Sequence, residues 1–140
     1  MKDNAASFGL KQILFVMFAA ATIGAVFNSG VFKSFILSIF WTAAIINSYS
    51  RFRLRNRAIV AGFHGIFAAC LLGAICGACL GVWRTQSVFG VLSAIGGLAV
   101  AFPIAWVPTF LISLVPDLYN ANGEKQSNVV TSLFAYIVGA

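Results

Sequence analysis

Acidic residues are nearly missing from this chain, which has three Asp or Glu against nine Lys or Arg in 140 residues. All three acids, Asp3, Asp117 and Glu124, lie outside the long apolar runs. Proton relays and secondary transporters normally carry ionisable groups, most often carboxylates, inside the membrane. This deficit therefore argues against proton-coupled transport, and it also removes the paired carboxylates used in general acid–base catalysis.

Other reactive groups are scarce as well. Histidine occurs once, as His64, and no Ser-His-Asp or phosphate-loop arrangement appears, so we expect no catalytic residues and no enzyme activity. Cys70, Cys76 and Cys79 share a predicted helix with His64, but at 100° per residue the four point in different directions. His64 would also lie about 22 Å along the axis from Cys79. One ion cannot be held by all four, so we expect no metal and no other cofactor.

Apolar residues dominate what is present. The chain is 61% hydrophobic and 9% charged, with a mean hydropathy of +0.96, which excludes a soluble domain of this size. A membrane crossing needs about 20 apolar residues, with a range of about 17 to 25. By this measure the first three uncharged runs each suit one helix, the fourth is too long for one, and the fifth is marginal. The runs cover residues 12 to 32, 34 to 50, 58 to 83, 85 to 116 and 126 to 140.

We therefore predict one all-α domain over residues 1 to 140, a polytopic membrane protein with a four-transmembrane-helix bundle and a short C-terminal amphipathic helix. Pro103, Pro108 and Pro116 interrupt the fourth run, so its crossing is expected to end near Trp106. If the fifth run also spans the membrane, there are five crossings. The predicted helices cover about 12 to 30, 33 to 50, 58 to 83 and 86 to 106, with an interfacial segment at 108 to 118 and the C-terminal helix at 127 to 140.

Basic residues set the expected orientation. Arg51, Arg53, Arg55 and Arg57 separate the second and third runs, and cytoplasmic loops collect Lys and Arg. This predicts a plasma-membrane protein, in a bacterial inner membrane, with both termini cytosolic. The four arginines are expected to face anionic lipid headgroups, and no nucleic acid is expected because the basic residues flank apolar runs.

The first run has an alternative interpretation. Lys2 and Lys11 precede an apolar stretch that contains Ala19-Ala20-Ala21, a pattern that also suits a signal peptide. We favour a retained helix, because the second run would otherwise lack a partner.

Small residues recur every fourth position in the third and fourth predicted helices. This spacing forms a glycine zipper, which lets two backbones approach closely in lipid. The two stripes either face each other within one chain or form the interface of a homo-oligomer. They consist of Ala69, Gly73, Gly77 and Gly81 in the third helix, and of Ser93, Gly97, Ala101 and Ala105 in the fourth.

Three further residues are candidates for a pathway or a hinge. His64 is the one ionisable side chain inside an apolar run, although it could equally be a neutral imidazole bonded to Ser, Thr or Asn47 of another helix. Pro103 and Pro108 could expose backbone carbonyls along a path, or simply mark a helix end.

These observations favour a non-enzymatic membrane protein that acts as an oligomerising or accessory subunit of a membrane complex. Its partners would be copies of itself or other membrane subunits. The alternative is an oligomeric channel, or a small-solute or ion transporter, with a pathway along the third and fourth helices. A polar stripe on the second helix keeps that alternative open, and it comprises Ser34, Ser38, Thr42 and Asn47.

Overall fold

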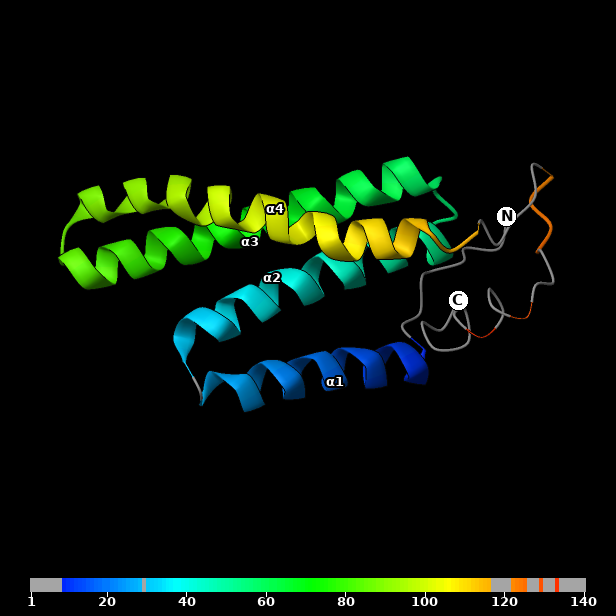
Figure 1. Ribbon diagram of the computed structural model, residues 1–140, viewed down its shortest axis with the longest axis horizontal. Helices are drawn as coiled ribbons and strands as arrows, with labels where there is room; N and C mark the ends of the chain where they lie inside the picture. The colour runs from blue at the N-terminus through cyan, green and yellow to red at the C-terminus, as the bar shows by residue number, and fades with distance from the viewer. Residues whose placement is uncertain (1–8, 29, 117–121, 126–128, 130–132, 134–140) are drawn as a thin grey trace.

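The computed structural model describes residues 9–28, 30–116, 122–125, 129 and 133, and its regular elements are helices (Figure 1). Three helical segments are long and apolar enough to cross a membrane, namely Val31–Arg53, Ala58–Thr85 and Val88–Ser113. An all-helical chain compatible with a membrane protein is therefore confirmed. The predicted C-terminal helix lies outside the described residues apart from Val129 and Leu133.

The first hairpin consists of α1 (Leu10–Phe27) and α2 (Val31–Ser48). Gly30 makes the turn with φ at 146°, a conformation that residues with a side chain rarely adopt. The helical path of α2 continues into a π-helical turn, η1 (Tyr49–Arg53), so Arg51 and Arg53 are helical whereas Arg55 and Arg57 are not. The apolar part of α1, Gln12–Phe27, is shorter than the three membrane-length segments.

The second hairpin consists of α3 (Ala58–Thr85) and α4 (Ser93–Ser113), joined through a short 3-10 helix, η2 (Val88–Leu92). Gln86 ends α3 in the left-handed conformation, with φ at 51°. Its side-chain amide donates a hydrogen bond of 2.7 Å to the carbonyl of Trp83. This bond satisfies one of the carbonyls that a helix leaves open at its C-terminal end.

The fourth helix ends later than the sequence indicated. α4 continues through Pro103 and Pro108 to Ser113 instead of stopping near Trp106, so residues 108 to 113 are part of the same helix. Prolines are tolerated inside membrane helices because neighbouring helices and Ser or Thr side chains compensate for the lost backbone bond. The Thr109 hydroxyl donates a hydrogen bond of 2.8 Å to the carbonyl of Ala105, next to the Ile104 carbonyl that Pro108 leaves without its backbone donor.

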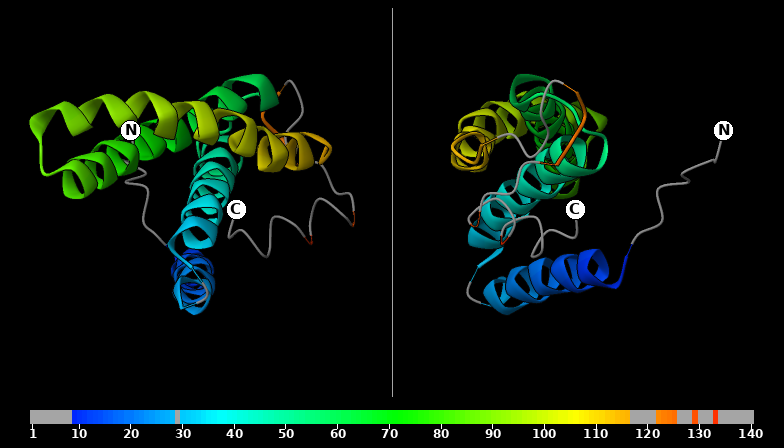
Figure 2. Two further views of the ribbon diagram at one scale, coloured as in Figure 1. Left: turned by 60° about the vertical axis from the view of Figure 1, so that its left-hand side comes forward. Right: turned by 90° about the vertical axis from the view of Figure 1, so that its right-hand side faces the viewer.

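The two hairpins cross each other. α2 packs against both α3 and α4, whereas α1 packs against α2. The left panel of Figure 2 looks nearly along α1 while α3 and α4 extend across the view, so their axes are far from parallel.

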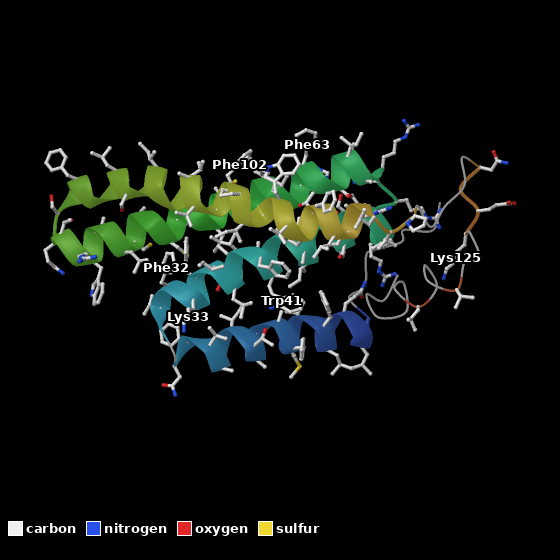
Figure 3. All side chains as sticks on the ribbon, in the orientation of Figure 1. Phe32, Lys33, Trp41, Phe63, Phe102 and Lys125 are labelled. Atoms are coloured by element: carbon white, nitrogen blue, oxygen red, sulfur yellow. The ribbon has the colours of Figure 1, made fainter. Side chains whose placement is uncertain are left out.

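The interior where α2, α3 and α4 meet is built from small side chains. Ala43, Ala69, Ala101 and Ala105 surround Ile39, and all five are fully buried. Large apolar side chains point outward instead, as Phe63 and Phe102 do in Figure 3. Such a surface would be costly in water, but lipid tails are as apolar as the side chains themselves.

Candidate functional site

The backbones of α3 and α4 touch along the small-residue stripes. A Cβ atom on Gly77 would lie 2.7 Å from the carbonyl oxygen of Ser93 and 3.0 Å from the Cα of Gly97. A Cβ atom on Gly97 would collide with the backbone of Gly73. The seam therefore leaves no room for side chains at these positions. Because the stripes face each other within one chain, a second copy would have to bind another face.

The same seam contains an interhelical hydrogen bond. The Ser93 hydroxyl lies 2.5 Å from the carbonyl oxygen of Gly77 and 2.6 Å from that of Gly90. Sequence reasoning selected Ser93 only for its size. Its hydroxyl also links the start of α4 to the middle of α3.

The first of the four arginines is used inside the protein. Arg51 is only 4% exposed, and its Nη1 and Nη2 groups donate hydrogen bonds to the carbonyls of Ile112 and Val115. A helix leaves its last carbonyls without intrahelical partners, and a cation near them also interacts favourably with the helix dipole. Arg51 therefore caps the end of α4, a role that the sequence analysis did not anticipate.

The other arginines are exposed. Arg53 donates a hydrogen bond of 3.2 Å to the side-chain carbonyl of Gln12, near the start of α1. Arg55 adopts the left-handed conformation with φ at 56°, and Arg57 immediately precedes α3. The arginine segment thus gathers the start of α1, the end of α2 and the end of α4 at one end of the molecule, called here the arginine end.

His64 also lies at the arginine end. Its Nδ1 atom is 2.8 Å from the Ser50 hydroxyl in η1, and that hydroxyl accepts a hydrogen bond of 3.0 Å from the Asn56 amide. The bonded partner is thus Ser50 and not Asn47. Asn47 is buried where α2 crosses α3, and a Cβ atom on Gly65 would lie 2.9 Å from its Cβ atom. The other two candidates for a pathway or a hinge, Pro103 and Pro108, lie inside α4.

The polar stripe of α2 takes part in contacts within the chain. The Ser34 hydroxyl donates a hydrogen bond of 3.0 Å to the carbonyl of Ile23 in α1. The Trp41 ring, which lies in the middle of α2, meets Phe15 and Phe18 edge-on at centroid distances of 5.4 and 6.0 Å. These contacts hold α1 against α2.

Two of the hollows on the surface of the described helices are relevant to function. The first, the aromatic cleft, has a volume of about 240 Å³ and lies between α3 and α4 near the arginine end; its wall includes Gly62, Phe63, Ile66, Trp106, Thr109 and Phe110. The second, the apolar groove, has a volume of about 620 Å³ and lies between α2 and the α3–α4 hairpin near the opposite end; its wall includes Phe32, Phe35, Leu80, Arg84, Gly96 and Val100.

Comparisons with known proteins add no residue to these sites. No family model, curated protein or solved structure matches this chain. Function therefore has to be inferred from the geometry of the helices themselves.

Proposed function

We propose that this chain is a non-enzymatic integral membrane protein that acts as an oligomerising or accessory subunit of a membrane complex. The aromatic cleft is the surface that binds the partner helix. In this proposal all four helices cross the membrane, α1 included, and the arginine end faces the cytosol of a bacterial inner membrane. The exposed Arg55 and Arg57 then lie at the level of anionic lipid headgroups.

The size of the aromatic cleft carries the proposal. Its volume of about 240 Å³ is smaller than the roughly 300 to 1,000 Å³ that is typical of small-molecule sites. A hollow of this size suits one large side chain from a neighbouring helix. Helix association in lipid depends on close packing because the hydrophobic effect contributes little there, so a fitted side chain supplies contacts that mobile lipid tails do not.

The walls of the cleft suit a helix contact. Phe63 and Phe110 are 69% and 62% exposed, and Trp106 of α4, 51% exposed, is also part of the wall. Aromatic residues, Trp and Tyr above all, are enriched at the centres of protein interfaces. Gly62 forms part of the floor, where a Cβ atom would lie 2.9 Å from the Thr109 methyl group. The depth of the hollow thus depends on this glycine.

An oligomeric channel or transporter remains the alternative from sequence, and the contacts between α3 and α4 bear on where its pathway would lie. Ser93 and Gly97 lie directly against Gly77, which closes the space between the two helices. A pathway would therefore have to run between chains. This makes the number and identity of the associated chains the first quantity to determine.

Native mass spectrometry of the protein, extracted in mild detergent from its own membrane, tests the proposal. We expect either several copies of this chain or stoichiometric foreign subunits. The double variant Phe63→Ala with Phe110→Ala should lose that association. Phe67→Ala is the matched control, because Phe67 is 71% exposed on the same helix and is not part of the cleft wall. A wild-type monomer without partners, or a double variant that associates normally, would contradict the proposal.

A further inference from the structure

The apolar groove exists because the two hairpins separate toward the end that carries their turns. Figure 1 shows α3 and α4 continuing beyond the start of α2 at that end. Phe32 and Phe35 line the groove from α2, Leu80 lines it from α3, and Val100 lines it from α4. Phe32 lies on the side of α2 that faces α3 in Figure 3. The groove is thus a wedge with apolar walls on three helices.

Gly96 leaves part of this wedge open. A Cβ atom on Gly96 would meet nothing within 4 Å, whereas the adjacent Gly97 packs against α3. The volume of about 620 Å³ exceeds that of a single side chain. Atoms that line an unfilled space lose their dispersion contacts, so in hydrocarbon an apolar molecule gains by filling it.

Besides its apolar walls, the groove has one charged group among the described residues that line it, the guanidinium of Arg84. From Gly77 to Arg84 the groove runs about 10 Å along α3, from the hydrocarbon toward the end of the helix. α3 has 28 residues and a crossing needs about 20, so in a membrane crossing centred on α3 its last turn would lie at headgroup level. The exposed Trp83 beside Arg84 is the kind of residue that favours this level.

We propose that the apolar groove binds one phospholipid from the leaflet at the end that carries the two hairpin turns. One acyl chain packs against Phe32, Phe35 and the bare backbone at Gly96, and the phosphate group accepts hydrogen bonds from the Arg84 guanidinium. Arginine suits this role because its planar group can donate two parallel hydrogen bonds to a phosphate. A helix from a second chain would fill the wedge as well, but an apolar helix would leave the arginine without a counter-charge.

Two substitutions separate the two halves of the site. Gly96→Leu places a side chain in the groove, where its Cβ atom would meet nothing within 4 Å, and Ala99→Leu is its control, because Ala99 is exposed on the same helix and is not part of the groove wall. Arg84→Gln removes the guanidinium. Lys33→Gln is the matched control, because Lys33 is an exposed cation at the start of α2 that does not line the groove.

The experiment is a lipid titration followed by native mass spectrometry of the full-length protein in detergent. The probes are phosphatidylglycerol and a diacylglycerol with the same chains but no phosphate. We expect one phosphatidylglycerol to be retained by the wild type and by both controls. Arg84→Gln should weaken its retention by about fivefold, the effect of losing one basic contact with a headgroup. Gly96→Leu should abolish retention, and diacylglycerol should bind the wild type as weakly as phosphatidylglycerol binds Arg84→Gln.

Any of three other outcomes would overturn this inference. Equal retention of phosphatidylglycerol by Arg84→Gln and wild type would remove the phosphate contact, and equal retention by Gly96→Leu would remove the groove. Displacement of the lipid by a second copy of the chain would assign the groove to a protein contact. The test is independent of the aromatic cleft, because the variant Phe63→Ala with Phe110→Ala should retain phosphatidylglycerol like the wild type whether or not it still associates.

Discussion

The two hairpins of this protein are held together in different ways. In the α3–α4 hairpin, backbone lies against backbone at Gly73, Gly77 and Gly97. In the α1–α2 hairpin, the contact runs through side chains, with Trp41 between aromatic rings and Ser34 bonded to a carbonyl of α1. Because lipid offers no hydrophobic gain for helix pairing, a tight seam tolerates no added atoms, whereas contacts through side chains can adjust.

Adding a side chain to the seam should have the largest effect. Gly97→Leu is expected to destabilise the α3–α4 hairpin by about 3 kcal/mol or more, because the leucine meets backbone that has no room to move. Gly96→Leu, one residue earlier, should change stability by less than about 0.5 kcal/mol. Unfolding in a denaturing detergent would measure both. Equal losses in the two variants would mean that α3 and α4 do not meet along this seam.

The second largest loss of stability is expected from removing Arg51, the arginine that joins the two hairpins. Arg51→Ala leaves the carbonyls of Ile112 and Val115 without these donors, at an expected cost of about 2 to 3 kcal/mol. Arg57→Ala, at an exposed position of the same segment, should cost less than about 0.5 kcal/mol. The same unfolding assay compares the two. If both variants lose the same stability, Arg51 acts only through the charge of the segment.

A smaller and local change is expected in the first hairpin. Trp41→Ala should cost about 1 to 2 kcal/mol, since each edge-on aromatic pair contributes about 0.5 to 1.5 kcal/mol. Spin labels placed on α1 and α2 should move apart, while labels on α3 and α4 keep their separation. Trp83→Ala provides a control at a residue that is 74% exposed. A change in the α3–α4 separation would show that the hairpins are not independent.

The smallest effect should come from one hydroxyl group. Ser34→Ala removes the bond to Ile23 and should cost about 0.6 kcal/mol, the average for a hydrogen bond between membrane helices. Ser38→Ala should cost less, because the Ser38 hydroxyl bonds to the carbonyl of Ser34 in its own helix. A larger loss for Ser38→Ala than for Ser34→Ala would argue against the α1–α2 contact described above.

Some of this structure follows from sequence and some does not. One helix start coincides with the end of a charged segment: α3 begins at Ala58, where the third apolar run begins, as expected if ionised side chains are excluded from hydrocarbon. The end of α4 was missed because tertiary contacts allow a helix to continue through Pro103 and Pro108. The contact of Trp41 with α1 was missed too, since it depends on which face of α2 the first helix covers.

The arginines illustrate the limit for the candidate sites. Arg51 and Arg53 are nearly equivalent in sequence, yet one is buried and the other exposed. The difference arises from the carbonyl of Ile112, which lies 61 residues further along the chain. The aromatic cleft and the apolar groove depend in the same way on how α3, α4 and α2 cross. The sequence shows which residues are small or charged and how they are spaced along a helix. It does not show which hollows these residues line.

The cap on α4 also has a consequence for biosynthesis. The chain is made from its N-terminus, so Arg51 is synthesised 61 residues before Ile112, the residue whose carbonyl accepts its hydrogen bond. While α3 and α4 are still being made, the guanidinium of Arg51 must be accommodated by water or by lipid headgroups at the membrane surface. The bond can close only after α4 has been synthesised along its full length. Closure of this bond therefore marks the completion of the α3–α4 hairpin.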